Sequence, residues 1–385
     1  MQLPIYLDYA ATTPVDPRVA AKMMGCLTMD GIFANPASRS HIYGWQAEEQ
    51  VELARRNVAS LLACDPREIV WTSGATESNN LALKGLFEHE DYAGGLITAT
   101  TEHKAIIDPA KWLARKGVSV SWLEPSHDGV ISLQQVRQAI DENTRLVSIM
   151  LVNNETGVVN PIAEIGKLCR EKGVLLHVDA AQAVGRVTVD VTALSVDLMS
   201  LSAHKFYGPK GVGALYVRRA VQSRLKPLIH GGGHERGMRS GTLATHQLAG
   251  MGEAARLVKE SHDEEVVTVA EKRDRLWWGI EDLPGVRRNG SRDNVSPGHL
   301  SVCFSGADGE ALLLSLRKLA VSSGSACTSA SLEPSYVLKA MGVSDEDAHS
   351  SIRISFGRFT TDADVSNAID HIRTIYTDLH RAQSV

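Results

Sequence analysis

The chain has 385 residues and a formal net charge of −5 at pH 7. This length is enough for two domains with substantial cores, and the slightly acidic balance argues against a protein that wraps nucleic acid. No run of about 18 apolar residues is present, so we expect neither a membrane span nor a membrane partner. A strand-like run follows Met1 almost at once, which predicts no signal or transit segment. The five cysteines are odd in number and lack metal-ligand spacing, which predicts a reducing, cytoplasmic location and no metal site.

Residues 69 to 217 alternate short β-rich runs with amphipathic helical stretches. This alternation is typical of βα units and predicts an α/β fold with a mostly parallel central sheet. The expected strands are 69–72, 96–100, 118–123, 146–152, 174–178, 197–202 and 213–217, with helices at 77–87, 106–116, 133–141 and 162–172.

The rest of the chain predicts a second, smaller domain. We expect a large cofactor-binding domain over residues 15–261, and a small α/β domain formed by residues 1–14 together with 262–385. A long polar helical stretch from Thr245 to about Arg275 would bridge the two.

Polar residues follow several of the expected strands. Ligands of parallel sheets bind beyond the carboxyl ends of the strands. Five segments fall at such ends, so we expect them to meet at one edge of the sheet; they are 73–76, 101–103, 153–155, Asp179 and Lys205.

Asp179 and Lys205 together indicate a pyridoxal phosphate site. A lysine amine can form a Schiff base with the cofactor aldehyde, and a carboxylate can keep the pyridine nitrogen protonated. Either residue alone is more often a member of a salt bridge or a helix cap. Each of them closes an apolar strand-like run, and this joint placement favours the catalytic interpretation.

The segment from Thr72 to Glu77 supplies a strand end, a glycine-containing turn and a helix start. Free backbone N–H groups at such a start, with the Thr76 hydroxyl, can bind the cofactor phosphate. An ordinary helix N-cap is the alternative for this string by itself. No P-loop or dinucleotide-binding glycine motif follows a strand.

Cys327 lies in a run of small residues from Val321 to Ser331. Most free cysteines are small buried hydrophobes, but this run has no large apolar neighbour to bury the thiol. We therefore expect an accessible loop of about residues 321–333, in the small domain, that presents Cys327 as a nucleophile. The other four cysteines sit beside apolar residues and are interpreted as structural; they are Cys26, Cys64, Cys169 and Cys303.

Eight sequence blocks, in order, carry a resemblance to a known family. The blocks are 35–38, 72–78, 101–104, 152–155, 178–182, 202–205, 231–242 and 323–327. With these, the chain resembles the cysteine desulfurases of the NifS/IscS family, within the class V aminotransferase-like, fold-type I pyridoxal phosphate enzymes. The similarity runs from Leu3 to about Arg373.

The resemblance implies a role for each matched residue. Catalysis would fall to Cys327, Lys205 and His103, with His103 stacked on the cofactor ring. Asp179 would pair with the ring nitrogen and Gln182 with the phenolic oxygen. The phosphate would be held by Ala75, Thr76, Ser202 and His204, with Thr242 reaching over from the neighbouring subunit of a homodimer. Asn154, which also contacts the cofactor, would bind the substrate carboxylate with Arg353, and Asn35 would join this substrate site.

The resemblance also implies the reaction. L-cysteine would be converted to L-alanine, leaving a persulfide on Cys327 that passes to an acceptor protein in iron–sulfur cluster assembly, tRNA thiolation or related sulfur trafficking. The alternatives are another lyase or an aminotransferase of the same fold, such as a selenocysteine lyase, or a desulfurase dedicated to DNA phosphorothioation. A lyase or aminotransferase would use Lys205 and Asp179 but would have no use for Cys327.

Overall fold

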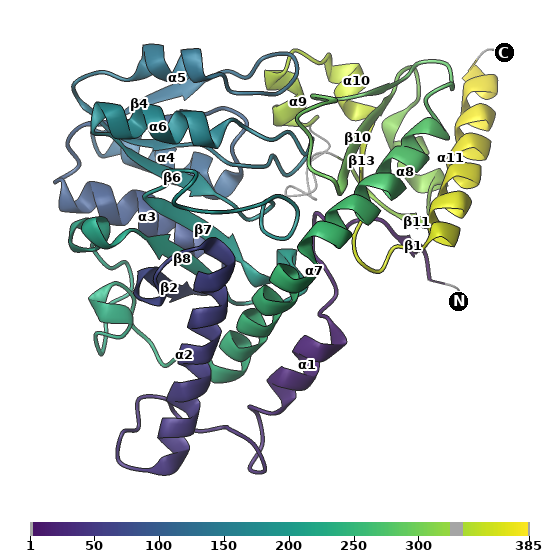
Figure 1. Ribbon diagram of the computed structural model, residues 1–385. Helices are drawn as coiled ribbons and strands as arrows, with labels where there is room; N and C mark the ends of the chain where they lie inside the picture. The colour runs from purple at the N-terminus through teal and green to yellow at the C-terminus, as the bar shows by residue number, and fades with distance from the viewer. Residues whose placement is uncertain (1–2, 324–333, 384–385) are drawn as a thin grey trace.

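The computed structural model describes residues 3–323 and 334–383, and its larger part is built on a seven-stranded sheet (Figure 1). The spatial order of the strands is β2-β8-β7-β6-β5-β3-β4. Neighbouring strands pair in parallel from β7 to β4, and β8 pairs antiparallel with both β7 and β2. The mostly parallel α/β fold is thus confirmed. The strands are β2 (Ile69–Thr72), β3 (Gly95–Ala99), β4 (Ser119–Leu123), β5 (Thr144–Ser148), β6 (Leu175–Asp179), β7 (Leu198–Ser202) and β8 (Gly213–Val217).

One strand ends earlier than its sequence predicts. The apolar run 146–152 suggests a strand to Val152, but β5 ends at Ser148. Pairing with β3 stops at Thr98 opposite Ser148. Ile149 and Leu151 still donate to β6, whereas Met150 donates to the Glu102 side chain. The chain then leaves the sheet and is free to form the loop at 153–156.

Helices cover both faces of this sheet with separate apolar clusters. Helices α3 and α4 pack on one face, and α2, α6 and part of α7 pack on the other. The helices of this part are α1 (Pro17–Met24), α2 (Ile42–Leu62), α3 (Ala75–His89), α4 (Lys104–Arg115), α5 (Leu133–Ala139) and α6 (Ile162–Lys172), with 3-10 helices at η1 (Pro66–Glu68), η2 (Ala203–Lys205), η3 (Arg219–Arg224) and η4 (Glu235–Gly237).

The smaller part is built on an antiparallel sheet of order β12-β13-β10-β9, covered by α8 and α11. Near it, β1 pairs in parallel with β11. Its elements are β1 (Ile5–Tyr6), β9 (Val286–Arg288), β10 (His299–Phe304), α8 (Gly309–Ser315), β11 (Leu319–Ala320), β12 (Ser322–Ser323), α9 (Tyr336–Ala340), α10 (Asp345–His349), β13 (Ser351–Ser355) and α11 (Asp362–Gln383).

Helix α7 (Thr245–Trp278) runs through both parts, as Figure 1 shows. Its Val258 belongs to the core of the large sheet, whereas Val269 and Leu276 belong to the core of the small one. We propose a domain division on this basis, with residues 15–261 in the large domain and residues 1–14 and 262–385 in the small domain. Among the described residues, no helix has both the length and the apolar character needed to cross a bilayer.

Candidate active site

A cavity of about 1430 Å³, counted with the space at its open mouth, lies where the carboxyl ends of the strands meet the small domain. The chain brings ten of the predicted residues to its wall; they are Ala75, Thr76, His103, Asn154, Asp179, Gln182, Ser202, His204, Lys205 and Arg353. These residues come from six segments that are far apart in the sequence. The cavity is thus the expected meeting point at the sheet edge.

Lys205 ends the short helix η2, which directly follows β7. Its Nζ donates hydrogen bonds to the carbonyl oxygens of Ala10 at 2.7 Å and Ala11 at 2.9 Å. The N-terminal segment therefore holds the amine at the cavity wall. Lys210 lines the same cavity, so the wall carries a second amine that the sequence did not reveal.

Asp179 is the last residue of β6, and its carboxylate is fixed by two donors. Oδ1 accepts from the backbone N–H of Ala181 at 2.9 Å, and Oδ2 accepts from Asn79 Nδ2 at 2.7 Å. These two hydrogen bonds hold the carboxylate in one orientation at the cavity wall. Asn79 escaped the sequence analysis, although it lies one helical turn after Thr76 and so on the same face of α3.

The N-terminus of α3 forms an anion-binding turn at one end of the cavity. Its N-cap, Gly74, has φ = 153°, a conformation accessible essentially only to glycine, and no side chain caps the helix. The N–H groups at a helix start attract anions. Glu77 supports the turn from outside, since it accepts from Ser73 N at 2.7 Å and pairs with Arg239 at 2.9 Å.

Two histidines of the cavity are fixed by local hydrogen bonds. His103 caps α4, with its Nδ1 accepting from Ala105 N at 3.1 Å. The proton of the neutral ring must then be on Nε2. His204 Nδ1 lies 3.1 Å from Thr12 Oγ1, and burial, followed by the charge of Lys205, lowers the pKa of His204 to about 4. His204 is therefore a neutral ring at pH 7.

Arg353 and Asn154 line the same cavity. Arg353 is only 3% exposed, and it donates to the carbonyl of Asn154 at 2.7 Å and to Asp8 Oδ1 at 2.9 Å. Its Nε and the Asn154 Oδ1 are buried without a hydrogen-bond partner in the described protein. Leaving a buried polar group unsatisfied costs about 1–3 kcal/mol. These two atoms therefore indicate a polar ligand.

The loop that carries Asn154 is organised by Asn153. The Asn153 Oδ1 accepts from the N–H groups of Glu155 and Thr156, and its Nδ2 donates to the carbonyl of Thr101. Glu155 behind it is buried, and this burial raises its pKa to about 7. Burial also raises the pKa of Glu102 well above its usual range. Burial thus favours the neutral form of both carboxyl groups, Glu155 and Glu102, and reduces the negative charge near the cavity.

Three predicted residues are not at the cavity of this single chain. Thr242 and Asn35 are both exposed, and the Asn35 side chain accepts from Ala37 N at 2.9 Å. Cys327 lies outside the described residues. The described residues on either side of it are close to the site, because Ser322 pairs with Arg353 across β12 and β13, and Ser335 hydrogen-bonds to Glu155.

Comparisons with known proteins identify the family of this chain. The family described as aminotransferase class-V matches residues 5–367. A curated cysteine desulfurase IscS from Aeromonas hydrophila subsp. hydrophila is 61% identical over 376 residues, which are 97% of this chain and 93% of that protein. A solved NifS-like protein superposes with a TM-score of 0.90 at 36% identity, covering 98% of this chain and 100% of that one. A structure of SspA in complex with cysteine has a TM-score of 0.82 at 41% identity, covering 92% of this chain and 99% of that one.

Proposed function

This chain belongs to the aminotransferase class-V family, and from that premise we propose how its cavity carries out cysteine desulfuration. The protein is a cysteine desulfurase that depends on pyridoxal 5'-phosphate, with L-cysteine as substrate and sulfur-acceptor proteins as partners. The observation that carries the proposal is the placement of Lys205, Asp179 and the uncapped start of α3 around one cavity.

The donors and acceptors of the cavity fit the parts of this cofactor. The turn at Gly74, with Ala75, Thr76 and Ser202, suits the phosphate, and Asp179 suits the pyridine nitrogen. Gln182 Nε2 donates one hydrogen to the Ala10 carbonyl at 2.7 Å, which leaves its second hydrogen for the phenolic oxygen. When bound, the cofactor supplies the electron sink that stabilises a carbanion at the substrate α-carbon.

The chain's own residues handle the amine, the proton and the carboxylate. Lys205 is the residue that would hold the cofactor aldehyde, and its free amine would accept the α-proton of cysteine as a base. The His103 ring, held at the cavity wall by its cap to α4, would offer its Nε2 proton to the substrate. Arg353 Nε and Asn154 Oδ1, the two unsatisfied atoms, orient the substrate, with the guanidinium binding the carboxylate.

Cys327 then takes the sulfur. Its thiolate attacks the sulfur of the bound substrate, so that an S–S bond forms while the carbon–sulfur bond breaks and its electron pair returns to the substrate carbon. That carbon would then be protonated, the proton held on Lys205 would return to the α-carbon, and alanine would leave. The persulfide on Cys327 is passed to an acceptor. We propose an acceptor of iron–sulfur cluster assembly or tRNA thiolation. The identity of 61% to a cysteine desulfurase IscS favours this function over the alternatives. These alternatives are a selenocysteine lyase, an aminotransferase and a desulfurase dedicated to DNA phosphorothioation.

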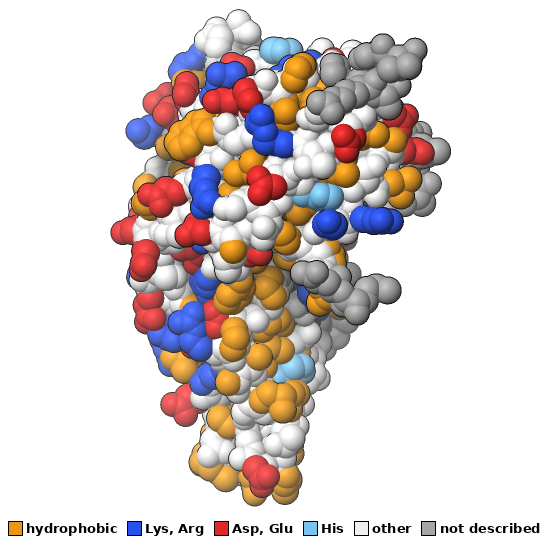
Figure 2. Space-filling view, turned by 90° about the vertical axis from the view of Figure 1, so that its right-hand side faces the viewer, with side chains coloured by type: hydrophobic (Ala, Val, Ile, Leu, Met, Phe, Trp, Pro, Cys, Tyr) orange, Lys and Arg blue, Asp and Glu red, His pale blue; other side chains and the backbone are white. Residues whose placement is uncertain are grey.

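We further propose a homodimer and a cytoplasmic location. Large apolar side chains are exposed around the connection between α1 and α2, and Figure 2 shows hydrophobic side chains gathered on the lower part of the molecule. They are Met24, Leu27, Met29, Phe33, Ile42, Tyr43 and Trp45. A surface of this kind favours a protein partner, and a second copy would let the exposed Asn35 and Thr242 serve its cavity. The four described cysteines are free, which favours a reducing compartment.

The purified protein tests this function directly. With bound cofactor it should absorb at about 390–420 nm, as expected for a lysine-linked pyridoxal ring. Added L-cysteine should yield one alanine for each sulfur that a reductant releases as sulfide. Transamination of a keto acid, or a colourless protein that takes up no cofactor, would contradict the proposal.

Asp179→Asn should slow alanine formation by roughly 10²–10⁴-fold, because a neutral amide does not keep the pyridine nitrogen protonated. The cofactor should also be lost faster on dialysis. Steady-state rates at saturating cofactor measure the first effect, and the residual visible absorbance measures the second. Asn79→Ala, which removes only the Nδ2 donor to Asp179, should reduce the rate far less. Equal rates for wild type and Asp179→Asn would contradict the role of Asp179.

A further inference from the structure

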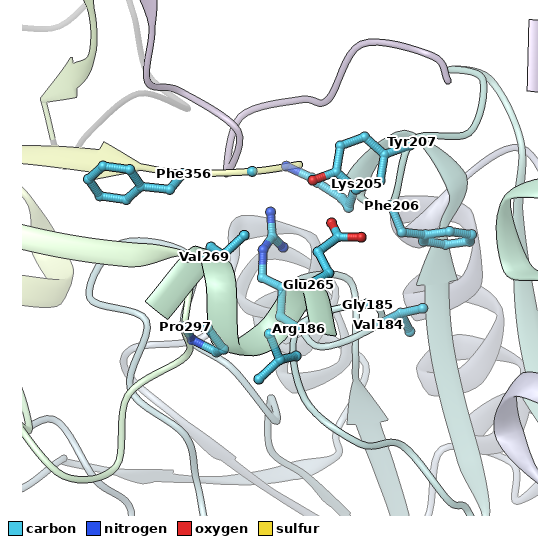
Figure 3. A pocket seen from close by; sticks show the side chains of 13 residues that line it. Val184, Gly185, Arg186, Lys205, Phe206, Tyr207, Glu265, Val269, Pro297 and Phe356 are labelled. Carbon is cyan, nitrogen blue, oxygen red and sulfur yellow. The ribbon is translucent and has the colours of Figure 1, made fainter. Parts of the chain in front are cut away.

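Arg186 is a buried cation behind the active site to which the reaction described above gives no role. Its side chain extends into a small pocket of about 350 Å³, beside Glu265 and across from Lys205 and Tyr207 (Figure 3). The residue is only 9% exposed, and no described carboxylate lies within ion-pair distance of its guanidinium. Burying a charged group without an ionic partner is costly, so this arrangement calls for an explanation.

All hydrogen bonds of Arg186 in the described structure go to neutral oxygens next to the cavity. Nη1 donates to the Gln182 carbonyl at 3.0 Å and to Gln182 Oε1 at 2.7 Å, and Nη2 donates to the Tyr9 carbonyl at 3.0 Å. The planar guanidinium thus ties the Gln182 side chain to the N-terminal segment. The two ends of the fork hold different residues, with Nη1 on Gln182 and Nη2 on Tyr9.

These contacts fix the amide of Gln182 in one orientation. Because Oε1 is bound to the guanidinium, Nε2 must face the Ala10 carbonyl, to which it donates at 2.7 Å. The same Ala10 oxygen accepts from Lys205 Nζ at 2.7 Å. A continuous chain of hydrogen bonds therefore runs from Arg186 through Gln182 and Ala10 to the reactive amine.

The charge of Arg186 also reaches the cavity. It is one of the cations that lower the pKa of His204, after burial and the charges of Lys205 and Lys210. Burial lowers the pKa of Arg186 to about 10, so its guanidinium is still charged at neutral pH. Of the titratable groups that face it, Glu265 and an ionised Tyr207 favour this charge, and Arg353 opposes it. A cation near the cavity disfavours protonation of any basic group bound there.

We propose that Arg186 is a positioning residue for the cofactor site: it turns the N–H donors of Gln182 toward the cofactor and steadies the carbonyls that hold Lys205. The inference rests on the proposed function, since it assumes that the cavity binds pyridoxal phosphate. In this proposal Arg186 acts through its hydrogen bonds to Gln182 and through the electrostatic effect of its charge on the cavity. It contacts neither the cofactor nor the substrate directly.

A pH titration of the absorbance of the cofactor-bound protein, together with its cofactor affinity, separates the effect of the Arg186 charge from the effect of its hydrogen bonds. Arg186→Met removes both the charge and the donors. It should raise by roughly one unit the pH at which the visible band is lost, because the protonated link to Lys205 is no longer opposed by a nearby cation. It should also weaken cofactor binding by roughly tenfold, because the amide of Gln182 is released. Arg186→Lys keeps the charge and should preserve the titration midpoint, but it should still weaken cofactor binding, since an ammonium cannot reproduce the fork.

A double variant and a matched control complete the test. Gln182→Leu should weaken cofactor binding, and Arg186→Lys should add little to that effect in the double variant, because both act through one contact. Arg273 on α7 is equally buried at 9% and donates to the Ser296 carbonyl at 3.1 Å, away from the cavity. Arg273→Met should lower the melting temperature without changing the titration midpoint or the cofactor affinity.

The possible outcomes distinguish this inference from the function on which it rests. If Arg186→Met behaved like Arg273→Met, with lower stability but wild-type titration and affinity, Arg186 would be structural and the inference wrong. If Arg186→Met fails to fold, Arg186→Lys decides: unchanged cofactor affinity would overturn the inference. Loss of the visible band in the wild type itself would instead overturn the proposed function.

Discussion

Lys205→Ala is expected to replace the absorbance band of the lysine-linked cofactor by that of the free aldehyde and to lower the rate of alanine formation by at least about 10³-fold. The structure supplies the reason: the Lys205 amine is held at the cavity wall by the carbonyls of Ala10 and Ala11. The variant removes both the covalent attachment of the cofactor and the base for the α-proton. Absorbance spectra and alanine assays of the same preparation measure the two losses.

Two further variants show whether the amine of Lys205 is specifically required. Lys205→Arg keeps the positive charge but cannot form the covalent link, so it should be as inactive as Lys205→Ala. Lys210 is the second amine on the cavity wall, and the Lys205→Ala/Lys210→Ala double variant should be no less active than Lys205→Ala alone. Wild-type alanine production by Lys205→Ala would refute the assignment.

Cys327→Ser should retain cofactor, colour and fold while losing sulfur release by at least about 10³-fold. The described residues before and after the segment support this prediction, since Ser322 pairs with Arg353 and Ser335 contacts Glu155 beside the substrate site. Cysteine should still bind and change the absorbance spectrum, because Lys205 and the ring are intact. Alanine and sulfide should not form, because no thiolate accepts the sulfur.

The same reasoning predicts where the persulfide forms. After brief treatment of the wild type with cysteine, without reductant, mass spectrometry should find one added sulfur on the peptide that contains Cys327. The four other thiols are poor nucleophiles at neutral pH, because burial raises the pKa of Cys64 and Cys169 to about 12 and also raises that of Cys26 and Cys303. Cys64→Ser is the matched control, as Cys64 is the least buried of the four, and it should keep the wild-type rate. An added sulfur on any other cysteine would make the assignment of Cys327 wrong.

The sequence alone determined the parts of this protein that depend on local patterns. The alternation of apolar runs and amphipathic stretches predicts the central sheet, and the run 213–217 matches β8 along its whole length. The carboxyl ends of parallel strands share one edge, so Lys205 after β7 and Asp179 at the end of β6 had to lie close to each other. Where the chemistry depends on which residue types stand at the ends of strands, it can therefore be predicted from the sequence.

Only the tertiary structure decided which side chains support that chemistry. Arg353 meets Asp8 across 345 positions of the chain, and Lys205 meets Ala10 across 195. No local pattern encodes such pairs, because the smaller part of the molecule is built from both ends of the chain and its packing onto the larger part brings them together. The reversed direction of β8 and the early end of β5 are of the same kind, since both depend on which strand lies alongside. Arg186 is the clearest case: in the sequence it is one arginine among many, and its contacts with Gln182 and Tyr9 exist only once the N-terminal segment crosses behind the cavity.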